Sequence, residues 1–252
     1  MSHIKTSQDH PDITTITFNR PEKRNALSIA LMTEFIKAIE IAKKNARVLI
    51  VRAEGPVFCA GLDLKEAQDP SIADESEQLV AQALQTIYAA PIPVIAAVHG
   101  AALAGGAGVM AACDYVVASE DCKFGFPEVK RGLVAAQVMS LLSRQLGQRH
   151  LRELLLFSSM IDAKRAHEIG LINRIVPQDK LYDSALAAAK EALLGAPIAI
   201  SQTKELIDEI YPASFIDDIN LGLEYHHEAR ISPEAKEGIE AFLNKRNPKW
   251  VE

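Results

Sequence analysis

The chain has 252 residues, of which 48% are hydrophobic and 24% are charged, so it is large and apolar enough to bury a sizeable core. One large domain, or one domain with a small appendage, is the simplest expectation. The formal charge of −6 argues against nucleic acid as the main partner and against a polybasic membrane anchor. Any anionic ligand must therefore be bound by a local group of positive side chains.

Cysteine content and hydropathy indicate a protein of a reducing, cytoplasmic compartment with no membrane partner. The cysteines are three in number and show no metal-ligand spacing: Cys59, Cys113 and Cys122. The polar residues 1–10 lack the apolar segment of a secretory signal. Residues 93–113 approach the length of a membrane span, but alanine and glycine dominate them and His99 interrupts them. We expect a buried strand, a glycine-rich turn and a buried helix there.

Strands and helices alternate over the first two thirds of the chain. Runs of β-branched residues predict strands, and apolar residues at helical spacing predict amphipathic helices, the first of them capped by Ser28. The predicted strands are 13–18, 47–52, 93–98 and 114–118, and the predicted helices are 28–45, 76–90 and 105–112. The alternation with short connections predicts an α/β fold around a mostly parallel sheet, with ligands at the carboxyl ends of the strands.

From residue 137 onward, helical segments follow one another. The predicted helices are 138–146, 150–157, 163–169, 181–194, 198–210, 214–230 and 233–245, with one short apolar strand at 171–176. Pro233 directly after Ser232 is typical of a helix N-terminus. We therefore predict a core of residues 1–195 and a C-terminal helical subdomain of residues 196–252.

Two loops are rich in small residues. Residues 58–65 lead from a strand region into a short helical stretch, and residues 99–108 follow the strand at 93–98 and open a helix. Backbone N–H groups at a helix start lack intrahelical partners and can receive developing negative charge. Two such amides aimed at one oxygen form an oxyanion hole, although tight helix packing would equally explain the glycines at 105–108. The G-x-G-x-x-G fingerprint of dinucleotide-binding proteins is absent from these loops.

Six segments, in order along nearly the whole chain, match one family. They are residues 19–27 (Asn-Arg-Pro-Glu-Lys-Arg-Asn-Ala-Leu), 58–63 (Phe-Cys-Ala-Gly-Leu-Asp), Gly105-Gly106 with Cys113-Asp114, 124–128 (Phe-Gly-Phe-Pro-Glu), 170–172 (Gly-Leu-Ile) and 237–242 (Glu-Gly-Ile-Glu-Ala-Phe). In these segments the chain resembles the crotonase superfamily, that is, the enoyl-CoA hydratase/isomerase family. The resemblance implies a spiral of ββα units and C-terminal helices that assemble a homotrimer or a dimer of trimers.

The resemblance also implies an acyl-CoA thioester as substrate, with CoA arriving as part of it and no separate cofactor. It assigns the oxyanion amides to Leu62 and Gly105, which would hold the thioester oxygen as it gains enolate charge. Hydratases of the family hold a water between two glutamates. This chain has Glu128 at the second position, but Gly108 stands where the first would be.

Glu128 by itself can act as an acid and base. It lies in an apolar segment, where burial would raise the pKa of its carboxyl group. One carboxylate is enough to move a proton between two carbons, so we predict Δ3/Δ2 double-bond isomerisation of an enoyl-CoA. Hydration with water oriented by other groups is the alternative. A further alternative is a catalytically silent member of the family that binds CoA or RNA. The presence of Glu128 argues against a silent protein, and the net negative charge argues against RNA binding.

Positive side chains for the CoA phosphates are expected at Lys23, Arg24 and Lys65, with ordinary solvated charge as the alternative for each. Weaker candidates lie at the C-terminal end: Lys245, Arg246 and Lys249. Further substrate contacts are expected at Ala26, Ala60, Asp63, Leu64, Gly106 and Leu133. Asp63 is more simply explained as a residue that braces its loop through backbone amides.

Other polar residues are expected to be structural. His99 should hold a backbone group at a strand end, Asp114 should orient a strand entry, and Cys59 should be a small packed residue. His226 and His227 are adjacent, so on a helix they face different ways and do not form a metal pair. No metal cluster, Ser-His-Asp arrangement or P-loop is apparent in the sequence.

Overall fold

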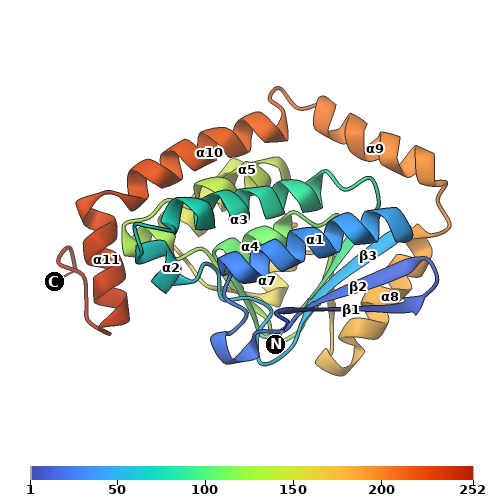
Figure 1. The fold of residues 1–252 in the computed structure, drawn as a ribbon, viewed down its shortest axis with the longest axis horizontal. Coiled ribbons are helices and arrows are strands. Elements are labelled where there is room, and N and C mark those ends of the chain that lie inside the picture. Colours follow the sequence, from blue (N-terminus) through green and yellow to red (C-terminus); the bar gives the residue numbers. More distant parts are fainter. Residues whose placement is uncertain (1, 252) are drawn as a thin grey trace.

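The fold is built on a six-stranded, mostly parallel sheet. The structure is a computed structural model that describes residues 2–251 (Figure 1). The strands, in their order across the sheet, are β1 (Ile4–His10), β2 (Ile13–Phe18), β3 (Val48–Ala53), β4 (Val94–Val98), β6 (Tyr115–Ser119) and β9 (Arg174–Val176). Only β1 is antiparallel to its neighbour. The predicted α/β class and the four predicted central strands are confirmed.

A second, smaller sheet lies next to the glycine-rich turn. It consists of β5 (Ala101–Leu103), β7 (Lys123–Gly125) and β8 (Ile161–Asp162), in the order β5-β7-β8. These strands and β1 were not predicted, since strands of two or three residues and a largely exposed edge strand show little hydrophobic patterning. The predicted strand at 171–176 is shortened to β9, because Leu171 belongs to a turn and donates its amide to Ala166.

Helices cover both faces of the large sheet. The α-helices are α1 (Ile29–Asn45), α2 (Leu64–Gln68), α3 (Ala73–Tyr88), α4 (Gly105–Ala111), α5 (Ala136–Gln145), α6 (Gln148–Leu156), α7 (Ala163–Glu168), α8 (Leu181–Ala192), α9 (Pro197–Glu209), α10 (Phe215–Arg230) and α11 (Pro233–Leu243). Short 3₁₀-helices are η1 (Pro21–Lys23), η2 (Glu128–Arg131) and η3 (Gln178–Lys180). The predicted caps are confirmed: Ser28 accepts the amide of Leu31, and Ser232 accepts that of Ala235.

Successive side chains of the buried strands point to opposite faces of the sheet and belong to two separate hydrophobic cores. Leu49 and Val51 of β3 face the main core, which α1, α3, α4 and α5 cover, whereas Val48 and Ile50 face α8 on the opposite side. Strands that are buried on both faces read as continuous hydrophobic runs, as these do. Residues 93–113 fold as β4, β5 and α4, so the predicted strand, turn and helix are confirmed. Within residues 2–251 no single helix is long and apolar enough to cross a membrane, although one bent helix pair passes that test together.

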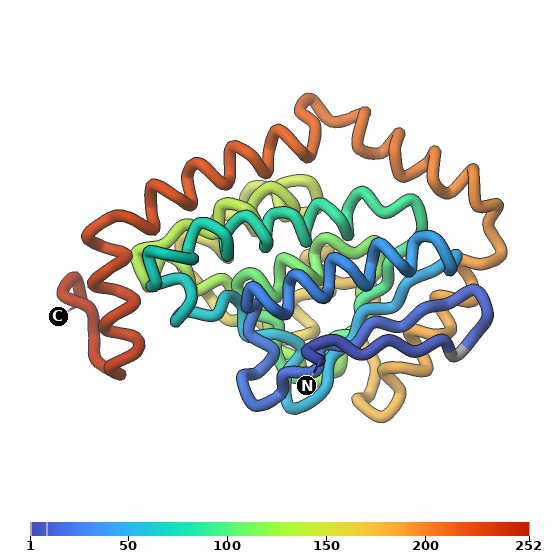
Figure 2. The backbone as a smooth tube through the Cα atoms, viewed as in Figure 1, coloured from blue at the N-terminus to red at the C-terminus, as the bar shows by residue number. Residues whose placement is uncertain are grey.

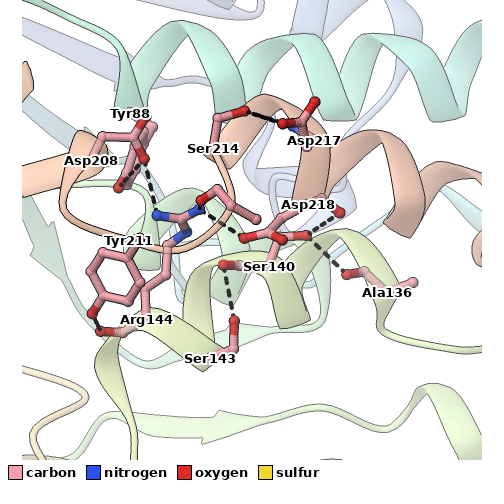
Figure 3. A network of polar contacts seen from close by, with 11 residues as sticks. Tyr88, Ala136, Ser140, Ser143, Arg144, Asp208, Tyr211, Ser214, Asp217 and Asp218 are labelled. Atoms are coloured by element: carbon pink, nitrogen blue, oxygen red, sulfur yellow. Dashed lines mark hydrogen bonds and ion pairs between the residues drawn. The ribbon is translucent and has the colours of Figure 1, made fainter.

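The C-terminal helices form an arch beside the core (Figures 1 and 2). α9 has no buried residue, whereas Phe215 and Ile219 of α10 belong to the main core. Arg144 of α5 fixes this arch: its guanidinium bonds to Asp208 at 3.0 Å and to Asp218 at 2.7 Å (Figure 3). The arrangement brings the end of α10 and α11 to the side of the molecule where α2 and α3 begin (Figure 1).

Candidate active site

A cavity of about 510 Å³ opens between the two glycine-rich loops, α3, η2, the start of α5 and the ends of α10 and α11. Most residues predicted to bind or transform a substrate meet on its wall. They are Lys23, Ala26, Ala60, Leu62, Asp63, Leu64, Lys65, Gly105, Glu128 and Leu133. Segments that are far apart in the sequence therefore form one site.

Two predicted substrate contacts do not reach this wall. Arg24 is exposed in a left-handed conformation at the end of η1. Gly106 is packed against Cys59, where an added Cβ atom would come within 2.6 Å of the Cβ of Cys59. Gly106 thus allows the two loops to approach each other, and Arg24 lies outside the cavity.

The two predicted oxyanion amides lie in loops that touch. Cys59 pairs with Ala102 of β5, and a Cβ atom on Gly61 would stand 3.6 Å from the amide nitrogen of Gly105. In the part of the chain that the structure describes, neither the Leu62 amide nor the Gly105 amide donates a hydrogen bond. Both residues line the cavity. An oxyanion hole needs two such unpaired donors aimed at one oxygen, so these loops supply the donors for one.

The backbone around these amides is held in uncommon conformations. Gly61 has a φ of 94°, and Ala104, the residue before Gly105, has a φ of 51° and a ψ of −128°. Such a conformation is costly for a residue with a side chain and persists only where the surroundings impose it. Here the Ala104 amide is tied to Gly125 of β7, which holds the turn in place.

Glu128 is a buried acid with an unsatisfied oxygen. It begins η2 directly after Pro127, is 8% exposed, and its Oε2 atom has no hydrogen-bond partner within the described residues. Burial raises the pKa of its carboxyl group to about 7, against smaller lowering effects of a backbone hydrogen bond and of Arg131. A carboxyl group with this pKa can both accept and return a proton near neutral pH.

The other acids on the cavity wall have fixed partners. Asp63 pairs with Arg20 at 2.8 Å and accepts the amide of Lys65, which agrees with a bracing role for this residue. Glu66 accepts the amide of Ile29 at 2.8 Å. Among the described acids on the wall, Glu128 is the one that forms no ion pair and also has a buried oxygen atom, Oε2, without a hydrogen-bond partner.

Glu77 is an acid of the wall that the sequence analysis missed. Its side chain is 4% exposed and forms an ion pair with Arg230, and its carboxylate lies 3.5 Å from Nε2 of His226. The sequence did carry a sign of this residue, because Glu77 is an acid at helical spacing from the apolar Val80 and Leu84, on the buried face of α3.

Glu77 also belongs to a cluster with metal-ligand spacing, together with Asp74 and His227. Arg230 forms ion pairs with both Asp74 and Glu77. A guanidinium therefore already provides the positive charge that a cation would bring, and we assign no metal to this cluster.

The space beside Gly108 is filled by apolar side chains. A Cβ atom on Gly108 would lie 3.0 Å from Cγ2 of Val138 and 3.6 Å from Cδ2 of Leu84. A side chain at residue 108 would require a small shift of Val138. The Cβ position at residue 108 is therefore in tight contact with Val138 and in ordinary contact with Leu84.

The residues expected to be structural take the expected contacts. The His99 ring bonds through Nε2 to the carbonyl oxygen of Gly55 at 2.8 Å, and Asp114 accepts the amide of Val94. Cys59 is fully buried and its thiol donates to the carbonyl oxygen of Asn25. Burial raises the pKa of Cys59 to about 12, so this thiol is not a nucleophile near neutral pH.

Comparisons with known proteins agree with this geometry. A model of the family described as enoyl-CoA hydratase/isomerase matches residues 9–252. The chain is 33% identical to the mevalonyl-coenzyme A hydratase of Aspergillus fumigatus, with 95% of this chain and 92% of that protein covered. It is 31% identical to an enoyl-CoA isomerase/hydratase of Mycosarcoma maydis, with coverages of 92% and 90%.

The fold also matches solved structures over its whole length. The crystal structure of an enoyl-CoA hydratase from Mycobacterium avium superposes with a TM-score of 0.87 at 29% identity and covers 100% of both chains. The predicted fold class is thereby confirmed. Since the family model spans nearly the whole sequence and two relatives exceed 30% identity, this chain is an enzyme of the enoyl-CoA hydratase/isomerase family, in the crotonase superfamily.

Proposed function

We propose that the protein isomerises the double bond of an enoyl-CoA between the Δ3 and Δ2 positions, with Glu128 as its acid and base. The observation that carries this proposal is the pairing of one unpartnered buried acid with two unpartnered amides on a single cavity wall. The family acts on acyl-CoA thioesters, and all three groups suit enolate chemistry on such a substrate.

The same carboxyl group removes the proton and returns it. The Glu128 carboxylate removes a proton from C2 of a 3-enoyl-CoA, and the electrons of that C–H bond form the enolate. The N–H groups of Leu62 and Gly105 donate to the thioester oxygen as it becomes negative. The Glu128 carboxyl group then returns the proton to C4 while the double bond forms between C2 and C3, so no other reactant is consumed.

The packing beside Gly108 supports isomerisation over hydration. Hydration needs a positioned nucleophilic water in addition to the acid, and Gly108, where the resemblance expects the glutamate that would hold it, has no side chain and is packed against Val138 and Leu84. Removing a proton and returning it requires Glu128 alone.

The cations at the cavity support binding of the CoA part. Lys23 and Lys65 are exposed residues of the wall and can meet phosphate groups there, and Ala26, Ala60 and Leu64 leave room for the pantetheine chain. CoA enters as part of the substrate, so the proposal includes no separate cofactor.

We further propose a trimer, or a dimer of trimers, in the cytoplasm. Large apolar side chains on the C-terminal arch support an assembly that covers them: Leu194, Ile198, Ile210, Leu221 and Tyr225 are 54–87% exposed. Three free, buried cysteines suit a reducing compartment.

The test is incubation of purified protein with 3-hexenoyl-CoA and, separately, with 2-hexenoyl-CoA, followed by product analysis. We expect interconversion of the two esters, and a loss of about 100-fold or more in Glu128→Gln. Glu120→Gln, the same change at an exposed residue, is the matched control and should keep full activity. Formation of a 3-hydroxyacyl-CoA alone would establish hydration instead, and unchanged turnover in Glu128→Gln would refute the catalytic assignment.

A further inference from the structure

The cavity wall carries a polar group that the proposed isomerisation does not use. Part of the wall is apolar, with Val80 of α3, Leu133 and Val134 between η2 and α5, and Val138 of α5. Glu77 and His226 interrupt this surface from two helices, α3 and α10. An alkyl chain offers these two side chains no hydrogen bond, so a plain hydrocarbon matches this part of the wall less well than a chain with a polar group.

The two side chains are held in place from behind. Arg230 pairs with the Glu77 carboxylate but is not part of the wall, and Gln137 donates its side-chain amide to the Glu77 carbonyl oxygen at 3.2 Å. His226 is anchored through Nδ1, which lies 3.2 Å from the carbonyl oxygen of Val134. Because a carbonyl oxygen can only accept, Nδ1 carries a proton and Nε2 is left to face Glu77.

The gap between Nε2 of His226 and the Glu77 carboxylate suits a shared oxygen atom. At 3.5 Å, the direct contact is longer than a good N–H···O hydrogen bond. An oxygen at the cavity side of the pair can lie within hydrogen-bond distance of both groups. A hydroxyl matches them chemically, since it can donate its proton to the carboxylate or to Nε2, both of which accept.

A purely structural ion pair explains less of this arrangement. Arg230 and Glu77 alone would tie α10 to α3, with no need for a second side chain on the wall. Buried ion pairs also contribute little net stability compared with apolar packing. The structural explanation accounts for Arg230 but not for the placement of both Glu77 and His226 at the cavity.

We propose that Glu77 and His226 form a hydroxyl-binding subsite, so that the preferred substrate is an enoyl-CoA whose acyl chain carries a hydroxyl group. The inference rests on the proposed function in one respect: it takes the cavity as the binding place of the acyl group. It adds a substrate class that catalysis by Glu128 does not require.

The experiment measures binding of saturated esters, which cannot isomerise. Hexanoyl-CoA is compared by calorimetry with hydroxyhexanoyl-CoA isomers whose hydroxyl lies on successive carbons of the outer half of the chain. Adipoyl-CoA, which ends in a carboxylate, is the third probe. We expect at least one hydroxy ester to bind about 10- to 100-fold more tightly than hexanoyl-CoA, and adipoyl-CoA to bind more weakly than that ester.

Variants assign the preference to the two residues. Glu77→Gln keeps the shape of the side chain but removes its charge, and should reduce affinity for the hydroxy ester about tenfold, while changing hexanoyl-CoA binding less than about threefold. His226→Gln should have the same selective effect. Glu75→Gln, an exposed acid on the same helix, is the matched control and should change neither affinity.

The outcomes separate the two proposals. Equal binding of hexanoyl-CoA and all hydroxy esters, or tightest binding of adipoyl-CoA, would overturn the hydroxyl subsite even if 3-hexenoyl-CoA is isomerised. A hydroxyl preference that Glu77→Gln abolishes would support the subsite even if no enoyl-CoA is isomerised, in which case the proposed reaction alone fails.

Discussion

Gly61 lies directly against Ala104: a Cβ atom on Gly61 would stand 2.8 Å from the Cβ of Ala104 and 3.0 Å from the carbonyl oxygen of Leu103. Each of the two is followed by a proposed oxyanion donor, Leu62 in one loop and Gly105 in the other. The spacing between those donors therefore depends on the absence of a side chain at residue 61.

Gly61→Ala should damage catalysis more than stability. The added methyl group pushes the two loops apart and misplaces a donor, which typically costs about 10²- to 10³-fold in kcat. Gly170→Ala is the control, because Gly170 also has a positive φ, of 81°, but an added Cβ meets nothing within 4 Å. Steady-state kinetics should show a normal kcat for the control; equal losses in both variants would contradict the role of the Gly61 contact.

The activity should rise with pH through neutrality. Isomerisation starts from the Glu128 carboxylate, and burial raises the pKa of this group to about 7. Below that pH the carboxyl group is protonated and cannot remove a proton, so kcat/KM for 3-hexenoyl-CoA should increase up to about pH 7 and then level off. A profile that falls over the same range would exclude Glu128 as the base.

Glu128→Gln should be more stable than the parent protein at alkaline pH. The folded-state pKa of about 7 lies above the ordinary value of 4.5, so the stability contributed by the protonated form is lost as pH rises from about 4.5 to about 7. The loss is about 3 kcal/mol above neutrality, and the glutamine variant avoids it. Thermal unfolding should show a higher Tm for the variant at pH 8 and a difference that shrinks toward pH 5; a constant difference would argue against burial of the acid.

Lys23→Ala and Lys65→Ala should raise KM about 2- to 5-fold with little change in kcat, since exposed cations contribute modest binding energy to the CoA phosphates. Added salt should reduce the effect. Arg24→Ala should have a smaller effect, because Arg24 lies outside the cavity wall, and Lys37→Ala on α1 serves as the exposed control. A larger effect in Arg24→Ala than in Lys23→Ala would show that the phosphates bind elsewhere.

Arg144→Met should destabilise the fold without altering the chemistry. The Arg144 side chain is 5% exposed, and its loss removes the guanidinium that pairs with Asp208 and Asp218 and leaves Asp208 with only its hydrogen bond from Tyr88 among the described contacts (Figure 3). Because the two aspartates are about a third exposed, breaking this network should cost about 1–3 kcal/mol, which chemical denaturation can measure. Arg149→Met, at an exposed residue of α6, is the control. The kcat of folded Arg144→Met should equal that of the parent, because Arg144 does not line the cavity.

Most of the architecture follows from local sequence signals. The central strands read as uninterrupted β-branched runs because both of their faces are buried, and Ser28 and Ser232 mark helix starts through a local hydrogen bond. The edge strand β1 lacked such a signal, since Ile4 is the only one of its described side chains to be buried. The short strands β5, β7 and β8 depend on pairing with distant segments, which no local pattern encodes.

The candidate site likewise has features that the sequence predicts and features that only the folded structure shows. Glu128 and the glycine-rich loops could be named from the sequence, because a residue type and its neighbours are enough to suggest an acid or a free amide. That Gly61 touches Ala104, that Val138 packs against Gly108, and that Glu77 meets His226 are contacts between segments far apart in the chain. Such contacts form only when the chain packs, so the sequence by itself identified the family and the base, whereas tertiary structure decided which groups share the cavity and what space they leave for a substrate.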